Sequence, residues 1–484
     1  MSKIHYLSHL AMFLFCLLTM GIHAQESPTA PLQLAYQDAG GAVLIYHESD
    51  GTTTTLIPAS DIPQNAQVSA KFSPDGHFGA VLVWQVVDTY LFNPDDEGKT
   101  IGKMGYKNTL YVYNLVTGEL LLGYDTLPAE FVIKPQERDA MLEADFGVQW
   151  SPNSDGLFFV RGTATPVDEY TTNGYGYLVH FNLLTQQLTD LPATGGTPYD
   201  WQWSKNGQYA VYRSIDNFGS GAGFSTSGVY VVNMTDITAI SQRALIGCCD
   251  DIVSHGWLNS GEFVYSYFSI LAGAAGLFVY NPQTDSTVAL LPQGQNNLDG
   301  NAMDIDPTTD AIVVSVYDFP ADEAILEAGI YVYENPQDAE PMKIADMMNG
   351  RLFFGAPYQV YIGSEAPIIY NIQTNLAVAD SAILRYVYGG GHNLYFTEGE
   401  TGARAYAVNT DGTLSIYDNI LPNDLLSSMR YTDAYFIGFI PHHYQGQMGS
   451  DVVYVGANDN PSTTRSVSIG AGNFLLDVTI QFND

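Results

Sequence analysis

The chain has 484 residues, of which 46% are hydrophobic, and it carries 52 acidic residues against only 17 basic ones. Its length and apolar content allow one large core or two ordinary ones. The formal net charge of −35 repels phosphate backbones and excludes nucleic acid as a partner, while it attracts cations and basic peptides or simply keeps the protein soluble.

The first 24 residues have the order of a secretory signal peptide. Lys3 precedes an apolar stretch over residues 10–18, and Ile22-His23-Ala24 follows as a cleavage site. The apolar stretch is shorter than the roughly 20 residues of a membrane span, so we expect cleavage near Ala24 and no membrane insertion. Cleavage removes one basic residue and no acidic one, which changes the charge from −35 to −36. We expect a secreted protein, extracellular or periplasmic, with a single domain over residues 25–484.

From about residue 33 onward, a short apolar or aromatic strand followed by Asn and a turn recurs. The copies are Tyr111-Val112-Tyr113-Asn114, Val179-His180-Phe181-Asn182, Tyr230-Val231-Val232-Asn233, Phe278-Val279-Tyr280-Asn281, Ile368-Ile369-Tyr370-Asn371 and Tyr406-Ala407-Val408-Asn409, with Tyr331-Val332-Tyr333 as a shifted copy. Leu44-Ile45-Tyr46 and Val452-Val453-Tyr454 bring the count to about nine. A period of about 40 to 50 residues is typical of one blade of four antiparallel strands.

A second repeated pattern, a tight turn between two apolar strands, precedes the first. It occurs at Phe72-Ser73-Pro74-Asp75-Gly76, Trp150-Ser151-Pro152-Asn153, Trp203-Ser204-Lys205-Asn206-Gly207, Trp257-Leu258-Asn259-Ser260-Gly261 and, more weakly, Ile305-Asp306-Pro307. Pro, Asp, Asn and Gly supply the backbone angles of a tight reversal, so each copy predicts a hairpin. Each unit therefore consists of strand A, a tight turn, strand B, a longer loop, strand C ending in Asn, a tight turn and strand D.

Such a four-stranded sheet cannot bury both of its faces alone. Radial stacking of the sheets around an axis solves this, so we predict an all-β fold, a β-propeller with four-stranded antiparallel blades. Because propellers typically have about four to eight blades, we favour eight, with seven and nine as alternatives. In the eight-bladed ring one terminal copy is degenerate or both chain ends share a blade. Residues 473–480 would then pair with the strand after Leu32 and close the ring.

The turns resemble those of a known group of propellers. Ser73-Pro74-Asp75-Gly76, Ser151-Pro152-Asn153 and Tyr113-Asn114-Leu115-Val116-Thr117-Gly118-Glu119 are similar to the WD-like repeats of TolB-type propellers and to the N-terminal propeller of dipeptidyl peptidase IV relatives. The resemblance covers nearly the whole mature chain. It implies the fold and gives no catalytic residues.

The two rims of the predicted ring differ. Antiparallel order places the A–B and C–D turns on one rim, the short-turn face, and the B–C and D–A connections on the other rim, the long-loop face. The predicted B–C loops cover residues 86–108, 163–175, 214–228, 266–275, 318–328 and 441–450. Long, individual loops on a rigid scaffold are where binding usually occurs.

Candidate ligand-binding residues in these loops are aromatic, acidic or imidazole side chains. They are Tyr90, Phe92, Asp95, Asp96, Asp168, Tyr170, Asp216, Phe218, Asp318, Phe319, His442 and His443. Aromatic faces beside carboxylates suit basic peptides or sugars; alternatively, the rings pack within their own loops and the carboxylates are solvated. Cys248 and Cys249 fall on the same face, either as a strained vicinal disulfide or as two buried thiols.

The sequence carries no catalytic signature. Neither a Gly-x-Ser-x-Gly elbow nor a His-Glu-x-x-His zinc motif is present. Asp304, Asp306 and Asp310 crowd one turn and offer a weak calcium site, but the run lacks the Gly and terminal Glu of an EF-hand, so turn formation is the better interpretation and we expect no cofactor.

We therefore expect a secreted, monomeric, non-catalytic β-propeller that binds a protein, peptide or glycan through its long-loop face. The alternative is a hydrolase or lyase that acts on an extracellular polymer with carboxylates at the channel mouth. A TolB-like assembly scaffold is a third hypothesis.

Overall fold

In the computed structural model, regular structure consists of strands and a few short helical turns. The described residues are 31–92, 101–133, 148–166, 172–192, 197–216, 226–246, 250–269, 274–317, 326–336, 340–346, 351–363, 367–378, 384, 387–391, 394–409, 413–432, 434–441 and 449–480. They contain 35 β-strands and the 3₁₀ helices η1 (Ala59–Asp61), η2 (Asn423–Ser428) and η3 (Pro461–Thr463). None of the helices in these ranges is long and apolar enough to cross a membrane.

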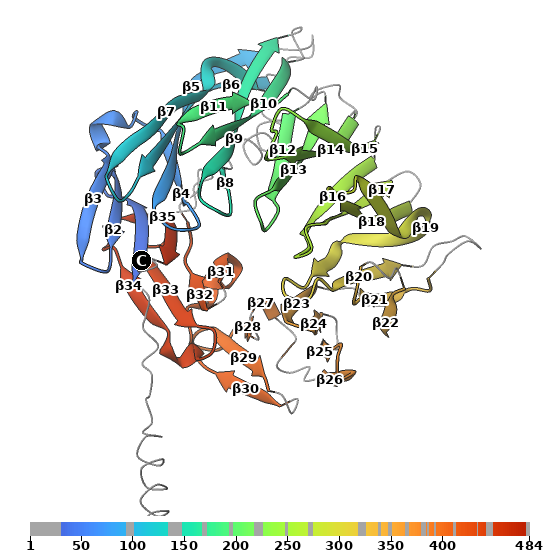
Figure 1. Cartoon of the computed structure of the whole chain (residues 1–484). Coiled ribbons are helices and arrows are strands. Elements are labelled where there is room, and N and C mark those ends of the chain that lie inside the picture. Colours follow the sequence, from blue (N-terminus) through green and yellow to red (C-terminus); the bar gives the residue numbers. More distant parts are fainter. Residues whose placement is uncertain are drawn as a thin grey trace, which may run out of the picture.

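Within the described ranges the strands form nine four-stranded antiparallel blades around one axis (Figure 1). Blades 1 to 3 contain β35 (Phe474–Ile480), β1 (Leu32–Gln37), β2 (Val43–His47) and β3 (Thr52–Ile57); β4 (Gln67–Phe72), β5 (Phe78–Phe92), β6 (Ile101–Asn114) and β7 (Glu119–Ile133); and β8 (Gln149–Trp150), β9 (Gly156–Pro166), β10 (Thr172–Asn182) and β11 (Gln187–Asp190).

Blades 4 to 6 continue the ring. They contain β12 (Thr197–Trp203), β13 (Tyr209–Asp216), β14 (Thr226–Asn233) and β15 (Ile240–Ile246); β16 (Asp250–Trp257), β17 (Phe263–Ser269), β18 (Ala274–Asn281) and the first part of β19 (Ser286–Ile305); and the last part of β19, β20 (Ile312–Tyr317), β21 (Gly329–Tyr333) and β22 (Met342–Ala345). The long strand β19 thus joins blades 5 and 6 into one seven-stranded sheet.

Blades 7 to 9 complete it. They contain β23 (Leu352–Ala356), β24 (Gln359–Ile362), β25 (Ile368–Asn371) and β26 (Leu376–Val378); β27 (Val387–Gly391), β28 (Leu394–Thr397), β29 (Arg404–Val408) and β30 (Leu414–Tyr417); and β31 (Met429–Tyr431), β32 (Tyr435–Gly438), β33 (Val452–Ala457) and β34 (Arg465–Ser468).

The preference for eight blades is wrong, and the described chain has nine, which was one of the stated alternatives. Each of the nine predicted strand C copies lies in a blade of its own, from β2 in blade 1 to β33 in blade 9. The two chain ends do share blade 1, but this does not reduce the number of blades, because strand β2 is the only strand C copy in that blade. The usual size range of propellers was therefore a weaker guide than the repeats themselves.

Ring closure by the two ends is confirmed. Strand β35 pairs antiparallel with β1, with Leu32 opposite Ile480 and Gln37 opposite Phe474. This pairing places a late segment as the innermost strand of blade 1 and satisfies backbone groups that an open sheet edge would expose.

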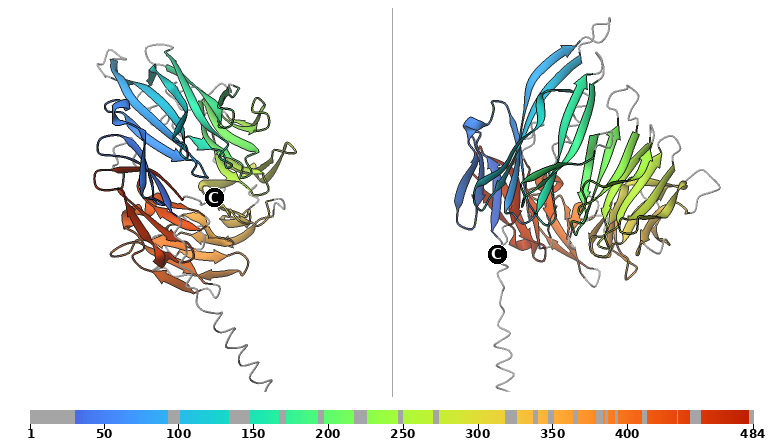
Figure 2. Two further views of the ribbon diagram at one scale, coloured as in Figure 1. Left: turned by 60° about the vertical axis from the view of Figure 1, so that its left-hand side comes forward. Right: turned by 45° about the horizontal axis from the view of Figure 1, so that its top comes forward.

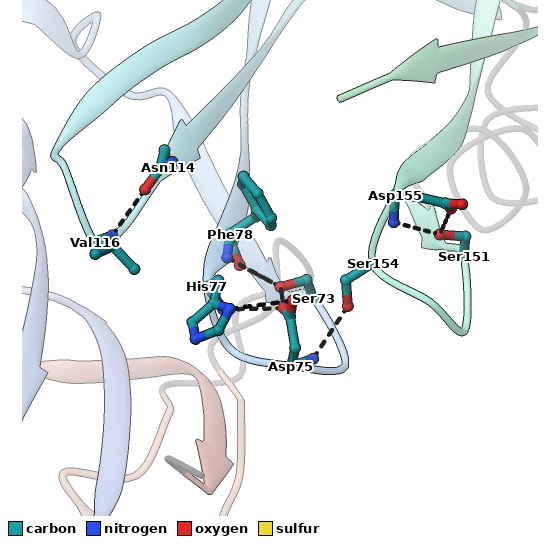
Figure 3. Close-up of polar contacts among 9 residues, drawn as sticks. All are labelled: Ser73, Asp75, His77, Phe78, Asn114, Val116, Ser151, Ser154 and Asp155. Atoms are coloured by element: carbon teal, nitrogen blue, oxygen red, sulfur yellow. Dashed lines mark hydrogen bonds and ion pairs between the residues drawn. The ribbon is translucent and has the colours of Figure 1, made fainter. Parts of the chain in front are cut away.

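The repeated Asn acts as a turn cap. In blade 2 the side-chain oxygen of Asn114 accepts a hydrogen bond from the backbone N–H of Val116 at 3.0 Å (Figure 3). It accepts another from the backbone N–H of Thr117, also at 3.0 Å. The equivalent residues Asn182, Asn233, Asn281 and Asn371 accept the same kind of bond. A short amide side chain can mimic a backbone turn in this way, which explains why Asn ends strand C.

The B–C connections are shorter than predicted because their flanks continue as strands. Residues 86–92 and 101–108 belong to β5 and β6, and β-branched and aromatic residues such as Val86, Val87 and Tyr90 favour this extension. The predicted loops at 163–175, 214–228 and 266–275 are also shortened, because the strands on both sides extend into them. Figure 2 (right) shows blade 2 projecting beyond its neighbours as a result.

The core lies between neighbouring blades. Leu82, Trp84 and Leu110 of blade 2 pack with Trp150 and Phe159 of blade 3 in one buried cluster. Further buried clusters join other blades around the ring. Each blade therefore needs its neighbours to bury its faces, as expected of a repeat protein.

Polar bonds also link the innermost strands of adjacent blades. The indole N–H of Trp150 in β8 donates to the carbonyl oxygen of Lys71 in β4 at 3.1 Å. On the other side of the ring, the carboxylate of Asp304 in β19 accepts a 2.7 Å bond from the N–H of Phe354 in β23. These bonds use backbone groups that no partner strand occupies on the inner edge of each blade.

Candidate functional site

The residues predicted to bind ligand on the long-loop face lie outside the residues whose side chains the structure describes. The backbone positions of Tyr90 and Phe92 lie at the end of β5, and that of Asp216 at the end of β13. The others, all outside the described residues, are Asp95, Asp96, Asp168, Tyr170, Phe218, Asp318, Phe319, His442 and His443, together with Cys248 and Cys249. Their roles in binding and in a vicinal disulfide stay predictions.

The described residues form a pocket on the opposite rim, the short-turn face. Its volume is about 330 Å³. It is lined by the end of β4 with the Ser73-Pro74 turn, by Gln149 and Trp150 of β8, by Arg430 of β31 and by residues 477–479 of β35. These are the innermost strands of blades 9, 1, 2 and 3, so the pocket depends on the closed ring. We call it the short-turn pocket.

Asp477 holds the wall of this pocket together. Its side chain is buried, accepts a 2.7 Å hydrogen bond from the N–H of Phe72 and forms an ion pair with the Nη1 group of Arg430. One carboxylate in β35 thereby connects the inner strands of blades 1, 2 and 9. A buried charge needs such partners, since desolvating an unpaired carboxylate is costly.

Arg430 is fixed by two contacts while half of its side chain stays exposed. Its guanidinium pairs with Asp477 and lies over the ring of Phe439, with 4.8 Å between Cζ and the ring centroid. Cation–π contact and ion pairing restrict the rotamers of the long side chain. Arg430 therefore holds a defined orientation at the pocket wall.

Lys71 contributes a second positive charge to the pocket. Its side chain is solvent-accessible, yet the concave wall surrounds it with protein, and this desolvation lowers the pKa of its ammonium. Asp477 opposes that shift, and the charge of Arg430 adds to it. Because its pKa is lowered, Lys71 holds its charge in this pocket at some cost.

The tight turns around the pocket bring Ser, Asp and His side chains together, as Figure 3 shows for blade 2. The hydroxyl of Ser73 donates to Asp75 at 2.6 Å, and the imidazole of His77 lies 3.3 Å from the other oxygen of Asp75. A nucleophilic serine would instead donate to the imidazole. Ser73 also accepts from the N–H of Phe78 at 3.0 Å, so this set locks the hairpin.

A second polar network joins the short turns of blades 4, 5 and 6. The ammonium of Lys205 donates to Asn259 Oδ1 at 2.6 Å and to the carbonyl of Pro307 at 2.9 Å, and Asp310 accepts from the N–H of Asn259 at 2.6 Å. Desolvation lowers the pKa of Lys205, while Asp310 and Asp306 oppose the shift. The polar groups of this network bond to one another across blades, so the network links blades 4, 5 and 6.

The three aspartates considered as a calcium site have separate tasks. Asp304 accepts from Phe354, Asp306 accepts from Thr309 Oγ1 at 2.6 Å, and Asp310 accepts from Asn259. Within the described ranges, no three His, Cys, Asp or Glu side chains gather closely enough to hold a metal ion. Turn formation and blade contacts account for these carboxylates.

Sequence reasoning missed the residues of the short-turn pocket. Two signals were available: Asp477 interrupts the apolar strand Phe474–Ile480, and Lys71 and Arg430 are two of only 17 basic residues. Their proximity could not be foreseen, because some 400 residues separate Lys71 from Asp477 in the chain.

No protein-family model matches the chain, and no curated protein sequence does. Among solved structures, dipeptidyl peptidase 4 of Porphyromonas gingivalis matches with a TM-score of 0.46 and 12% identity over 90% of this chain and 56% of that chain. The β-propeller domain of the Trilobed protease from Pyrococcus furiosus gives 0.37 and 10% over 83% and 97% of the two chains. TolB from Acinetobacter baumannii gives 0.26 and 12% over 66% and 67%.

The chain is thus structurally similar to propellers of the dipeptidyl peptidase and TolB types, the two groups that its turns resemble. The chain spans 56% of the length of the peptidase. At such low identity, a shared propeller fold carries no information on activity, because the same fold supports many functions.

Proposed function

We propose that this chain is a secreted, monomeric, non-catalytic β-propeller that binds a protein, peptide or glycan through its long-loop face. The supporting observation is the extension of blade 2. Strands β5, β6 and β7 have 15, 14 and 15 residues, whereas the second and third strands of blade 7 have four each. The paired strands form a fixed base for the connection over residues 93–100, which we call the tip of blade 2, and a fixed base lowers the entropy cost of binding.

The register of the extension provides a clean test. Phe92 lies opposite Ile101, so residues 93–100 can be replaced by Asn-Gly, a two-residue turn that preserves the hairpin. The replacement removes the candidate ligand-binding residues Asp95 and Asp96. We expect binding on glycan and peptide arrays to weaken at least about tenfold, the effect of losing one or two buried polar contacts.

The matched control is Asp418→Asn, which removes one exposed carboxylate on the outer strand side of blade 8 and should bind as the wild type does. Equal binding by the wild type and the shortened variant would refute a role for this tip. Turnover of a polysaccharide or peptide in the same panel would instead support the hydrolase or lyase hypothesis, and a stable protein partner without array binding would support the scaffold.

A further inference from the structure

The short-turn pocket has the size of a small-molecule site. Its volume of about 330 Å³ is at the lower end of the range for ligand pockets and equals the share of about ten water molecules in the liquid. It lies at the A–B turn ends of the inner strands. The tip of blade 2 extends from the opposite ends of β5 and β6, roughly 45 Å away along a 15-residue strand.

The net charge of the pocket has the opposite sign to that of the whole protein. Although the formal net charge is −35, the pocket contains Lys71 and Arg430 against the single carboxylate of Asp477. Asp477 is buried and already bonded to Phe72 and Arg430. The charged groups that line the pocket therefore sum to about +1, and the neutral side chains of Gln149 and Thr479 complete its polar lining.

Lys71 is the group with unused bonding capacity. Among the described residues its ammonium has no hydrogen-bond partner and no ion pair within reach, in contrast to Lys205, whose ammonium bonds to Asn259 and Pro307. Desolvation by the concave wall lowers the pKa of Lys71. An anion beside it would relieve that cost and supply the missing acceptor.

Apolar side chains line the pocket beside these cations. Phe72 and Trp150 are buried between blades and border the pocket only with the small part of each side chain that stays accessible, and the indole N–H of Trp150 is already bonded to the carbonyl oxygen of Lys71. Val478 continues this surface. The low dielectric of these apolar groups strengthens charge-assisted hydrogen bonds beside them.

We propose that the short-turn pocket binds a small organic anion, with its carboxylate held by Lys71 and Arg430 and its apolar part against Phe72 and Trp150. A monoanion matches the net charge of about +1, whereas a phosphate group carries about −1.5 to −2 at neutral pH. This site goes beyond the proposed function, because it lies on the opposite rim and uses none of the long-loop residues.

The test uses 4-fluorobenzoate as the probe and the full-length protein, with binding followed by fluorine NMR. We expect saturable binding by the wild type, at least about tenfold weaker binding by Lys71→Gln through loss of one charge-assisted bond, and binding within about threefold of wild type by Lys71→Arg. Lys71→Gln should fold normally, because the side chain is accessible and unbonded. Lys343→Gln, on outer strand β22, is the matched control and should not differ from wild type.

Three competitors define the chemistry. Unlabelled benzoate should displace the probe, whereas benzamide, its uncharged analogue, and inorganic phosphate should be at least about tenfold weaker competitors. The proposal is overturned by absence of saturable probe binding, by equal binding to wild type and Lys71→Gln, or by benzamide or phosphate competing as well as benzoate. The variant shortened at residues 93–100 should bind the probe as the wild type does. The outcome of this test is therefore independent of whether the proposed long-loop function is correct.

Discussion

Removal of the Asp477 carboxylate should weaken the seam where the ring closes. In Asp477→Ala, the buried N–H of Phe72 loses a charged acceptor, which costs about 1.5 to 3 kcal/mol. The ion pair with Arg430 is worth less, about 0.5 to 1 kcal/mol, because Arg430 is 48% exposed and partly screened by solvent. We expect the free energy of unfolding to fall by about 3 kcal/mol in total.

The assay is urea denaturation followed by tryptophan fluorescence. Asp477→Asn keeps an acceptor for Phe72 but removes the charge, so it should lose about half as much stability as Asp477→Ala. Asp418→Asn makes the same Asp-to-Asn change at the exposed pair with Arg404, in which Arg404 is 41% and Asp418 58% exposed. It should lower the free energy of unfolding by at most about 0.5 kcal/mol. If Asp477→Ala unfolds at the same urea concentration as Asp418→Asn, the carboxylate does not hold the seam and the reasoning is wrong.

Three further predictions concern other parts of the ring. Glu48→Ala removes the partly buried partner of Arg465 in β34 and the acceptor of the Leu32 N–H at 2.8 Å, so it should lower the free energy of unfolding by about 2 kcal/mol in urea titrations. An unchanged value would show that the Glu48–Arg465 pair does not help to join blades 9 and 1. Gly355→Ala places a methyl group against the ring of the buried Tyr395 between blades 7 and 8 and should lower the free energy of unfolding by about 2 kcal/mol. Gly123→Ala is the control, because its added carbon meets its nearest neighbour at 3.9 Å and should not change stability. Equal melting temperatures of the two variants would contradict this prediction. Burial, and then the charge of Arg213, lowers the pKa of His255 from 6.5 to about 4. As the pH falls, the unfolded chain therefore takes up a proton on His255 before the folded chain does. The contribution of neutral His255 to the free energy of unfolding is complete above pH 6.5 and falls by about 2 kcal/mol between pH 7.5 and pH 5. His255→Gln should remove that part of the pH dependence of the urea midpoint, and an identical pH profile in both proteins would count against it.

Much of the fold could be predicted because local patterns encode local structure. Asn114 and its equivalents mark the end of each strand C, since an amide side chain can cap the turn that follows. Ser73 and Asp75 mark the A–B hairpin in the same way. The blade number was misjudged only where a general size range replaced the count of these marks, and the loop over residues 86–108 was overestimated because its strand-forming residues were assigned to a connection.

The candidate site could be predicted far less well. Aromatic and acidic residues in variable loops indicate a face, but no spacing among them defines a pocket. The short-turn pocket was invisible to such reasoning because Lys71, Arg430 and Asp477 occupy three different blades and follow no motif.

The sequence by itself determined the repeated unit and its strand order, because turn capping and the pairing of successive strands depend on residues close together in the chain or on a repeated period. The pairing of the two ends followed from the need to close the ring without an open sheet edge. Only the tertiary structure decided which inner strands face one another. Closing nine blades around one axis brings β35, β4, β8 and β31 together, and that closure creates a cationic pocket in an acidic protein. Its chemistry arises from side chains hundreds of residues apart, which no local pattern specifies.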